Sequence, residues 1–221
     1  MIRNILLFGI AMTLWAASAA AGNIVLNPGF ETSDFTSWTN NDWFVETTDD
    51  GVVPHSGTYY ADTGCVGAGC LTTDPTNGSF FFQDLATTMG ATYTISFWYD
   101  LGNTLCDACD GSGDTPGDPT DDFAELQAMW GATTILDVTS TNLPDAGYVN
   151  FTINAVATST SMQLEFLGRQ DPRELGVDDV CVDLQGGACG SGATSTPEPA
   201  SLLLMGGGLL GFGILRFRRK A

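Results

Sequence analysis

Apolar and polar residues alternate strictly along several stretches of the chain. Apolar side chains occupy every second position over 93–99, 124–130, 149–153 and 162–166. A period of two is the pattern of half-buried antiparallel β-strands, whose side chains point in turn to the core and to solvent. These stretches therefore predict strands, and Trp130, in phase with its apolar neighbours, is expected in the core.

Turn-forming residues fill the gaps between the predicted strands. Gly, Pro, Asn and Asp are frequent there, as expected for tight connections between strands. Residues 22–196 show neither a long amphipathic helix nor a repeat of fixed period. Many short strands without helices predict an all-β domain, a single antiparallel β-sandwich over 22–186.

The first 21 residues have the features of a secretory signal peptide. Arg3 provides a positive charge, residues 5–15 are mostly apolar, and small residues follow at 17–21. This order of charge, apolar run and small residues is typical of a cleaved leader. The alternative is an uncleaved anchor, for which the apolar run is short of the ~20 residues that span a bilayer.

The last 25 residues have a different organisation. A Gly/Ser/Thr-rich linker at 187–196 leads to Pro197, Glu198 and Pro199, and an apolar, Gly-rich run then precedes the basic stretch at 216–220. The prolines stop any preceding element, and basic residues stay on the cytoplasmic side of a membrane. Residues 200–215 make about 24 Å of helix at ~1.5 Å per residue, which is short for a permanent span.

This C-terminal arrangement, in its order and spacing, resembles the PEP-CTERM sorting signal of Gram-negative bacteria that make exopolysaccharide. The resemblance covers 197–221 and implies transient insertion of a short helix in the inner membrane. It also implies cleavage near Pro197-Glu198-Pro199 by an exosortase-type enzyme and release to the cell surface or extracellular matrix. An ordinary tail anchor is the alternative.

The charge balance narrows the range of partners. The chain has 7 Lys and Arg against 26 Asp and Glu, a net charge of −19. Between residues 22 and 196 the basic residues are Arg169 and Arg173 alone. Nucleic-acid binding needs clustered cations, so nucleic acid is excluded as a partner. A surface this acidic repels itself and attracts divalent cations weakly.

Short pieces of the sandwich region, in their order, resemble galactose-binding-like jelly rolls, including carbohydrate-binding modules. They lie at 27–31, 35–38, 54–60, 81–85, 91–97 and 175–180. The resemblance implies two stacked antiparallel sheets with the first and last strands adjacent. It also implies a structural Ca²⁺ where these strands meet, with the ligands Glu31, Asp178 and Asp179. The alternative for the two aspartates is an exposed strand edge.

Six cysteines fall in three close pairs, which in an exported chain indicate disulfides. Six cysteines allow 15 connectivities. We expect the local ones: Cys65–Cys70, Cys106–Cys109 and Cys181–Cys189. The CxxC spacing of the second pair also fits a redox or metal site, but it lacks the strand-to-helix context of a redox motif and a second ligand pair.

Further candidates for binding lie in loops and on aromatic side chains. The acid-rich loop at 107–122 offers oxygen ligands for Ca²⁺ or is simply a solvated loop. Trp98, Trp38 and Trp43 are candidate platforms for a sugar ring, with packing inside the domain as the alternative for each. His55 is expected in a surface turn.

These observations lead to three functional hypotheses. The first is an exported, non-enzymatic protein that associates with extracellular polysaccharide, specifically exopolysaccharide, through its jelly roll. The second is a structural matrix or adhesion protein, cross-bridged through cations, without a sugar site. The third is an extracellular hydrolase. It has the weakest support, because the sequence contains no nucleophile motif and carboxylate pairs are expected by chance in so acidic a chain.

Overall fold

The computed structural model describes residues 22–49, 51–67, 69–102, 123–141, 147–171, 173–187 and 189. Several sequence predictions lie outside this part of the chain: the signal peptide at 1–21, most of the 187–196 linker, the sorting segment at 197–221, the Cys106–Cys109 pair and the acidic loop at 107–122. In the described residues no helix is long and apolar enough to cross a membrane.

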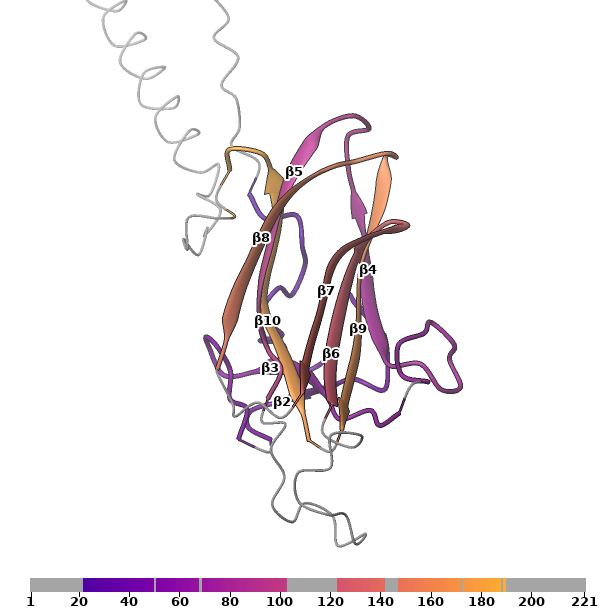
Figure 1. Ribbon diagram of the computed structural model, residues 1–221. Helices are drawn as coiled ribbons and strands as arrows, with labels where there is room; N and C mark the ends of the chain where they lie inside the picture. The colour runs from indigo at the N-terminus through magenta and orange to yellow at the C-terminus, as the bar shows by residue number, and fades with distance from the viewer. Residues whose placement is uncertain are drawn as a thin grey trace, which may run out of the picture.

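The described residues form ten β-strands (Figure 1). In chain order they are β1 (Thr39–Asn41), β2 (Phe44–Glu46), β3 (Tyr60–Thr63), β4 (Phe80–Ala86), β5 (Thr92–Asp100), β6 (Phe123–Trp130), β7 (Thr133–Thr141), β8 (Val149–Val156), β9 (Ser161–Asp171) and β10 (Leu175–Leu184). All four stretches with alternating residues lie in strands, namely β5, β6, β8 and β9.

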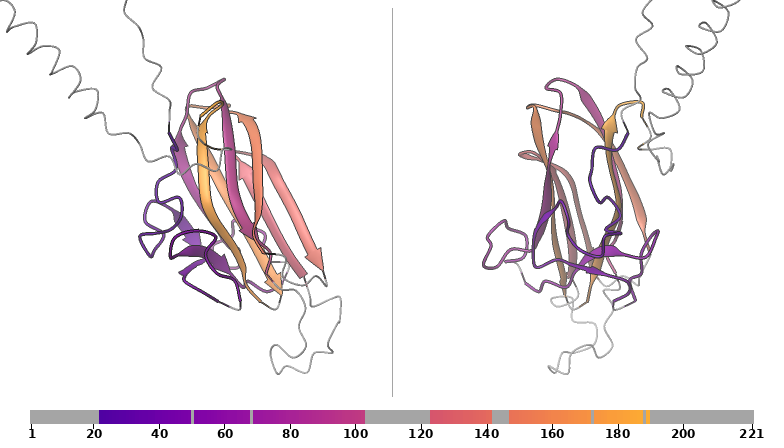
Figure 2. Two further views of the ribbon diagram at one scale, coloured as in Figure 1. Left: turned by 90° about the vertical axis from the view of Figure 1, so that its left-hand side faces the viewer. Right: turned by 180° about the vertical axis from the view of Figure 1, so that it is seen from behind.

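The strands form two five-stranded sheets stacked face to face (Figures 1 and 2). Sheet A has the order β1-β4-β9-β6-β7, and sheet B has the order β2-β3-β10-β5-β8. Neighbouring strands in both sheets run antiparallel. The prediction of an all-β antiparallel sandwich is therefore confirmed.

Aromatic side chains join the two sheets across the core. Phe166 of β9 in sheet A packs edge-on against Phe97 of β5 in sheet B, with ring centroids 4.8 Å apart. Phe166 also stacks at 4.7 Å on Phe81 of β4, and Phe81 contacts Trp43 at 4.6 Å. Each of these rings buries a large apolar area, so this aromatic column is a main source of the sandwich's stability.

The two ends of the described chain lie side by side. The Ile24 amide donates to the Val182 carbonyl at 2.8 Å. The Asn23 side chain donates to the Val180 carbonyl at 2.9 Å and accepts from the Val182 amide at 2.9 Å. These bonds bring the N-terminal segment that precedes β1 next to β10. The first and last strands themselves, β1 and β10, belong to different sheets, so the expectation that they are adjacent is wrong.

Two of the three candidate sugar platforms belong to the core. Trp38 is 7% exposed and Trp43 is 2% exposed, and both pack against Phe81. The Trp38 indole N–H donates to the Asn27 carbonyl at 3.1 Å. Burial leaves neither ring a face for a ligand, so these two residues correct the sequence-based expectation. Trp130, expected in the core, is buried.

Candidate functional site

Strand β10 carries a bulge at the two predicted metal-binding aspartates. Its pairing with β5 shifts register between Asp178 and Cys181, and Asp179 has a φ of 52°. Asp179 adopts a conformation that is uncommon for residues with a side chain but tolerated by aspartate. The bulge turns both carboxylates toward the same loop, 54–59, with Asp178 fully buried and Asp179 partly exposed.

His55 and Ser56 hold the two carboxylates. His55 Nδ1 lies 2.7 Å from Asp179 Oδ2, and the Ser56 hydroxyl donates to Asp179 Oδ1 at 2.8 Å. The Ser56 amide donates to Asp178 Oδ2 at 3.0 Å. The pKa of the Asp178 carboxyl is raised to about 7, because burial and, to a smaller extent, the neighbouring Asp179 charge outweigh the backbone hydrogen bonds that lower it.

Glu31, the third predicted metal ligand, lies beside this group, and its carboxylate accepts hydrogen bonds from the backbone. Its Oε1 accepts from the amides of Thr58 at 2.8 Å and Tyr59 at 3.1 Å. One ligand atom each from His55, Asp178 and Asp179 lies within 4.8 Å of the others, and Glu31 is outside this set. The fold thus unites the two predicted aspartates and adds a histidine that the sequence placed in an ordinary turn.

Gly29 shows how close Glu31 comes to the aspartates. A Cβ at Gly29 would lie 3.5 Å from Asp178 Oδ1, 3.6 Å from Asp179 Oδ1 and 3.9 Å from Glu31 Cγ. The three acids therefore surround one glycine of the N-terminal loop. Such convergence of carboxylates from both chain ends is repulsive unless protons, hydrogen bonds or a cation offset the charge.

Trp98 is on the outer face of sheet B but is not an open platform. The His55 ring stacks on its indole with centroids 3.8 Å apart and planes at 15°. The Tyr148 ring meets the same histidine edge-on at 5.4 Å. One face of the predicted sugar platform is therefore covered by the protein itself.

The 47–59 loop covers this end of the outer face of sheet B. The Tyr60 hydroxyl accepts from the Asp49 amide at 3.2 Å and donates to Asp62 Oδ2 at 3.2 Å. Gly176 faces the same layer, and a Cβ there would lie 2.8 Å from the Tyr148 hydroxyl and 3.0 Å from Val52 Cγ1. This polar layer therefore packs closely over Gly176 of β10.

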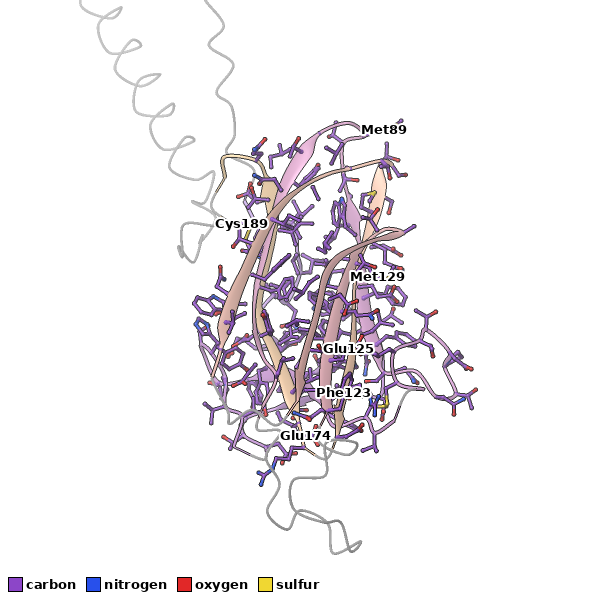
Figure 3. All side chains as sticks on the ribbon, in the orientation of Figure 1. Met89, Phe123, Glu125, Met129, Glu174 and Cys189 are labelled. Atoms are coloured by element: carbon purple, nitrogen blue, oxygen red, sulfur yellow. A yellow bond between two sulfur atoms is a disulfide. The ribbon has the colours of Figure 1, made fainter. Side chains whose placement is uncertain are left out.

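The outer face of sheet A is built differently. Cross-strand register places Phe82 of β4, Glu165 of β9 and Met129 of β6 in one row. The next row holds Phe80, Leu167 and Gln127. In Figure 3 Phe123, Glu125 and Met129 follow one another along β6. This face combines aromatic, aliphatic and polar side chains in the mixture that sugar-binding surfaces use.

A disulfide-bonded loop borders this face. The loop at 64–79 projects beside the outer side of sheet A (Figure 1) and contains the disulfide Cys65–Cys70. It is tied to the end of β9, because the Gly67 amide donates to Asp171 Oδ1 at 2.9 Å and the Gln170 amide donates to the Cys65 carbonyl at 3.0 Å. The predicted pairing of these cysteines is confirmed, and so is Cys181–Cys189.

Glu165 is the unusual residue of this face. It points away from the core, in alternation with Leu164 and Phe166, yet it is only 6% exposed. Within the described part of the chain its carboxylate has no hydrogen bond or ion pair. Burial raises the pKa of the Glu165 carboxyl above its usual value of 4.5. Neither carboxylate oxygen is among the buried polar atoms that lack a hydrogen-bond partner, so the carboxylate still reaches solvent and is open to a donor from outside the protein.

Arg169 lies on the same face but is already engaged. Its guanidinium lies 4.5 Å above the Phe123 ring, a cation–π arrangement. It also pairs with Asp171, to which Arg169 Nε donates at 2.7 Å. The described part of this face therefore has no uncompensated cation.

A hollow opens along β4 of the same sheet, between this strand and the N-terminal segment. Its volume is about 470 Å³, and its lining includes Phe82 and Asp84 together with Leu26 and Thr39. Phe82 and Asp84 also belong to the outer face, so the hollow continues the row that contains Glu165. The two features form one candidate site, which we call the sheet A face.

The sequence offered an incomplete signal for this site. Alternation over 162–166 places Glu165 on the outer side of its strand. The apolar run Phe80-Phe81-Phe82 hides which ring faces outward, and only strand register sets Phe82 beside Glu165. Burial of an outward-facing acid depends on neighbours from other strands, which no local pattern specifies.

Comparison with solved structures finds several sandwiches of similar outline. TmCBM61 in complex with β-1,4-galactotriose has 15% identity and a TM-score of 0.48, with 74% of this chain and 99% of that chain covered. The CBM22-1 xylan-binding domain of Xyn10C from Paenibacillus barcinonensis has 15% identity and a TM-score of 0.46, with 77% and 100% covered. The K3 cleaved adhesin domain of Lys-gingipain from Porphyromonas gingivalis has 13% identity and a TM-score of 0.47, with 74% and 98% covered.

The structural neighbours thus include carbohydrate-binding modules, although likeness at these scores carries no argument about ligands. No curated protein matches the chain. Residues 195–220 match the family model described as the PEP-CTERM protein-sorting motif, which confirms the expectation drawn from Pro197, Glu198 and Pro199. The chain therefore carries a PEP-CTERM protein-sorting motif, which indicates export, membrane-anchored sorting and exosortase processing in a Gram-negative bacterium.

Proposed function

We propose that this exported protein binds extracellular polysaccharide, without catalysing a reaction on it, through the sheet A face. The observation that carries the proposal is Glu165, an outward-facing acid that is only 6% exposed and has no hydrogen-bond donor among the described residues. A sugar supplies hydroxyl donors for such a carboxylate and apolar ring faces for neighbouring aromatic side chains. The sorting motif supports the proposal, because an exported protein can meet polysaccharide outside the cell.

Several side chains around Glu165 support this assignment. Phe82 and Met129 flank the carboxylate in cross-strand register and offer apolar surface to a sugar ring. Gln127, whose amide donates to Glu125 at 2.8 Å, adds polar groups one row away. By contrast, the face of sheet B that holds Trp98 is covered by the His55 loop.

Affinity electrophoresis in gels with the producer's own exopolysaccharide tests the proposal. Phe82→Ala should weaken binding by about 3- to 10-fold, the equivalent of ~0.5–1.5 kcal/mol for an aromatic contact. Phe44→Ala is the matched control, because Phe44 is an exposed phenylalanine in sheet B. The control should migrate like the unchanged protein.

The result that would overturn the proposal is unchanged migration of the unmodified protein in every polysaccharide gel. That result would favour the structural matrix or adhesion hypothesis, with cations as cross-bridges. Release of sugar fragments during incubation would instead favour the hydrolase hypothesis.

We also propose that the acids at the β10 bulge hold a structural Ca²⁺. Calcium prefers several oxygen ligands, and Glu31, Asp178 and Asp179 converge around Gly29 from both ends of the domain. The raised pKa of Asp178 fits the need for a counter-charge there. His55 and Ser56 orient Asp179 and would keep that role with the ion bound.

Thermal melting with and without a chelator tests the ion. At about 100-fold excess over Kd, bound Ca²⁺ adds ~2.7 kcal/mol to the free energy of unfolding, so chelation should lower Tm. Glu31→Ala should remove most of that sensitivity. Neutralising the acids at 107–122 is the control for the loop: if this change, and not Glu31→Ala, removes the chelator effect, the ion is in the loop.

A further inference from the structure

The charges of the sheet A face are of one sign. The carboxylates that register places on it are Asp171, which pairs with Arg169, and the four acids Asp84, Glu125, Asp137 and Glu165. Its cation among the described residues, Arg169, is compensated by Asp171. A ligand on this face therefore meets a negative surface.

Glu165 is the charge on this face that most requires a partner. The Asp84 carboxylate accepts from the Gln163 amide at 3.5 Å, and the Glu125 carboxylate accepts from the Gln127 amide. No such donor reaches Glu165 in the described residues. Its neighbours Phe82 and Met129 are apolar, so the local dielectric is low and an ion pair formed there is strengthened.

The chemistry of the donor follows from these surroundings. A hydroxyl donates a hydrogen bond to the carboxylate but stays neutral, whereas an ammonium donates a hydrogen bond and adds the attraction between opposite charges. An ammonium beside Phe82 also gains from the negative face of the ring. A carboxylate-bearing sugar would instead be repelled by four acids.

We infer that the sheet A face selects polysaccharides with free amino groups, that is, hexosamine units without N-acetyl groups, and that Glu165 pairs with the sugar ammonium. This inference rests on the proposed function and names the chemical class of its ligand. It also assigns the specificity of the site to a charge for which the described residues provide no donor.

Isothermal titration of the full chain in mild detergent with three oligosaccharides of equal length tests the inference. The probes are glucosamine oligomers, N-acetylglucosamine oligomers and oligogalacturonate, at a pH below the amine pKa. Glucosamine oligomers should bind at least tenfold more tightly than the acetylated ones, the fold-change equivalent to about 1.4 kcal/mol. Oligogalacturonate should not bind, and added salt should reduce the preference.

Glu165→Gln is the informative variant, because the amide keeps the shape and removes the charge. It should abolish the preference for free amines while leaving binding of the acetylated oligomer within about twofold. Glu46→Gln in β2 of sheet B is the matched control and should keep the preference. Unchanged circular dichroism and Tm would show that the variants fold. Should Glu165→Gln fail to fold, Glu125→Gln should reduce the preference in its place.

The outcomes separate this inference from the proposed function. Equal binding of free and acetylated oligomers, or a preference that survives Glu165→Gln, overturns the amine specificity and leaves polysaccharide binding intact. Binding of none of the probes together with no retardation by the producer's exopolysaccharide overturns both.

Discussion

Asp178 illustrates how surroundings give a single side chain its properties. The residue is fully buried on the outer side of β10, beside Asp179 and beneath His55 and Ser56. Removal from water destabilises its charged form, and the adjacent negative charge acts in the same direction. Its pKa of about 7 follows from burial first and from this charge second.

The raised pKa predicts how stability depends on pH in the absence of calcium. Asp178 has a pKa of about 7 when folded and an ordinary value of 3.8 when unfolded, so the folded state binds the proton more tightly between these values. The free energy of unfolding should therefore fall as pH rises from about 4 to about 7. The contribution is a few kcal/mol, with ~4 as an upper bound.

Melting curves across this pH range, recorded with a chelator, measure the effect. Asp178→Asn should flatten the dependence and raise Tm at pH 8, because it removes the buried charge. Saturating Ca²⁺ should reverse the slope, since a bound cation favours the ionised carboxylate. A Tm that rises with pH in the chelated protein would contradict the assignment.

At the scale of elements, the two described disulfides fasten segments that border the candidate sites. Cys65–Cys70 closes the loop beside the sheet A face, and Cys181–Cys189 fastens β10 to the residues that follow it. Both close short loops, which constrain the unfolded chain only modestly. Locally, one disulfide holds the loop beside the sheet A face in place, and the other holds the C-terminal part of β10.

Replacing Cys65 and Cys70 together with Ala should lower the free energy of unfolding by about 2 kcal/mol, the low end of the range for disulfides. Denaturant titration measures this loss. Polysaccharide binding should weaken as well, because the loop bonded to Asp171 borders the site. Unchanged stability with unchanged binding would show that the loop keeps its shape without the bond.

Cys106–Cys109 stays a prediction from sequence, and peptide mapping without reduction tests it. The map should recover this pair together with the two described ones. Free thiols at these two positions would contradict the local pairing.

At the scale of the whole molecule, a negatively charged sandwich is joined to a sorting motif. The motif covers 195–220, and the sandwich has its described end at β10 and Cys189. The predicted linker at 187–196 lies between the sandwich and the sorting motif.

Intact-mass measurement of the surface-released protein tests the sorting prediction. Cleavage close to Pro197-Glu198-Pro199 should remove residues 202–221 and with them the basic stretch. Because four of the chain's seven basic residues lie there, the released protein should also be more acidic. Detection of the basic stretch on the mature protein would contradict cleavage at this motif.

The sequence by itself determined the features that depend on local order. Alternation fixed the strands and the core positions of residues such as Leu164 and Phe166, because a period of two places successive side chains on opposite faces. The spacing of Cys65 and Cys70 predicted their pairing. The order of residues in 197–220 predicted the sorting motif, which is recognised as a linear segment.

Only the tertiary structure decided what each outward or loop residue meets. Trp38 and Trp43 are buried because distant strands close over them, while Trp98 is covered by His55 from a separate loop. The β10 bulge brings His55 to Asp179, 124 residues away in sequence. Strand register sets Glu165 between Phe82 and Met129, which offer it no hydrogen-bond donor from their side chains. How deeply a side chain is buried and which groups it contacts depend on residues distant in sequence. A local pattern carries no information about those residues.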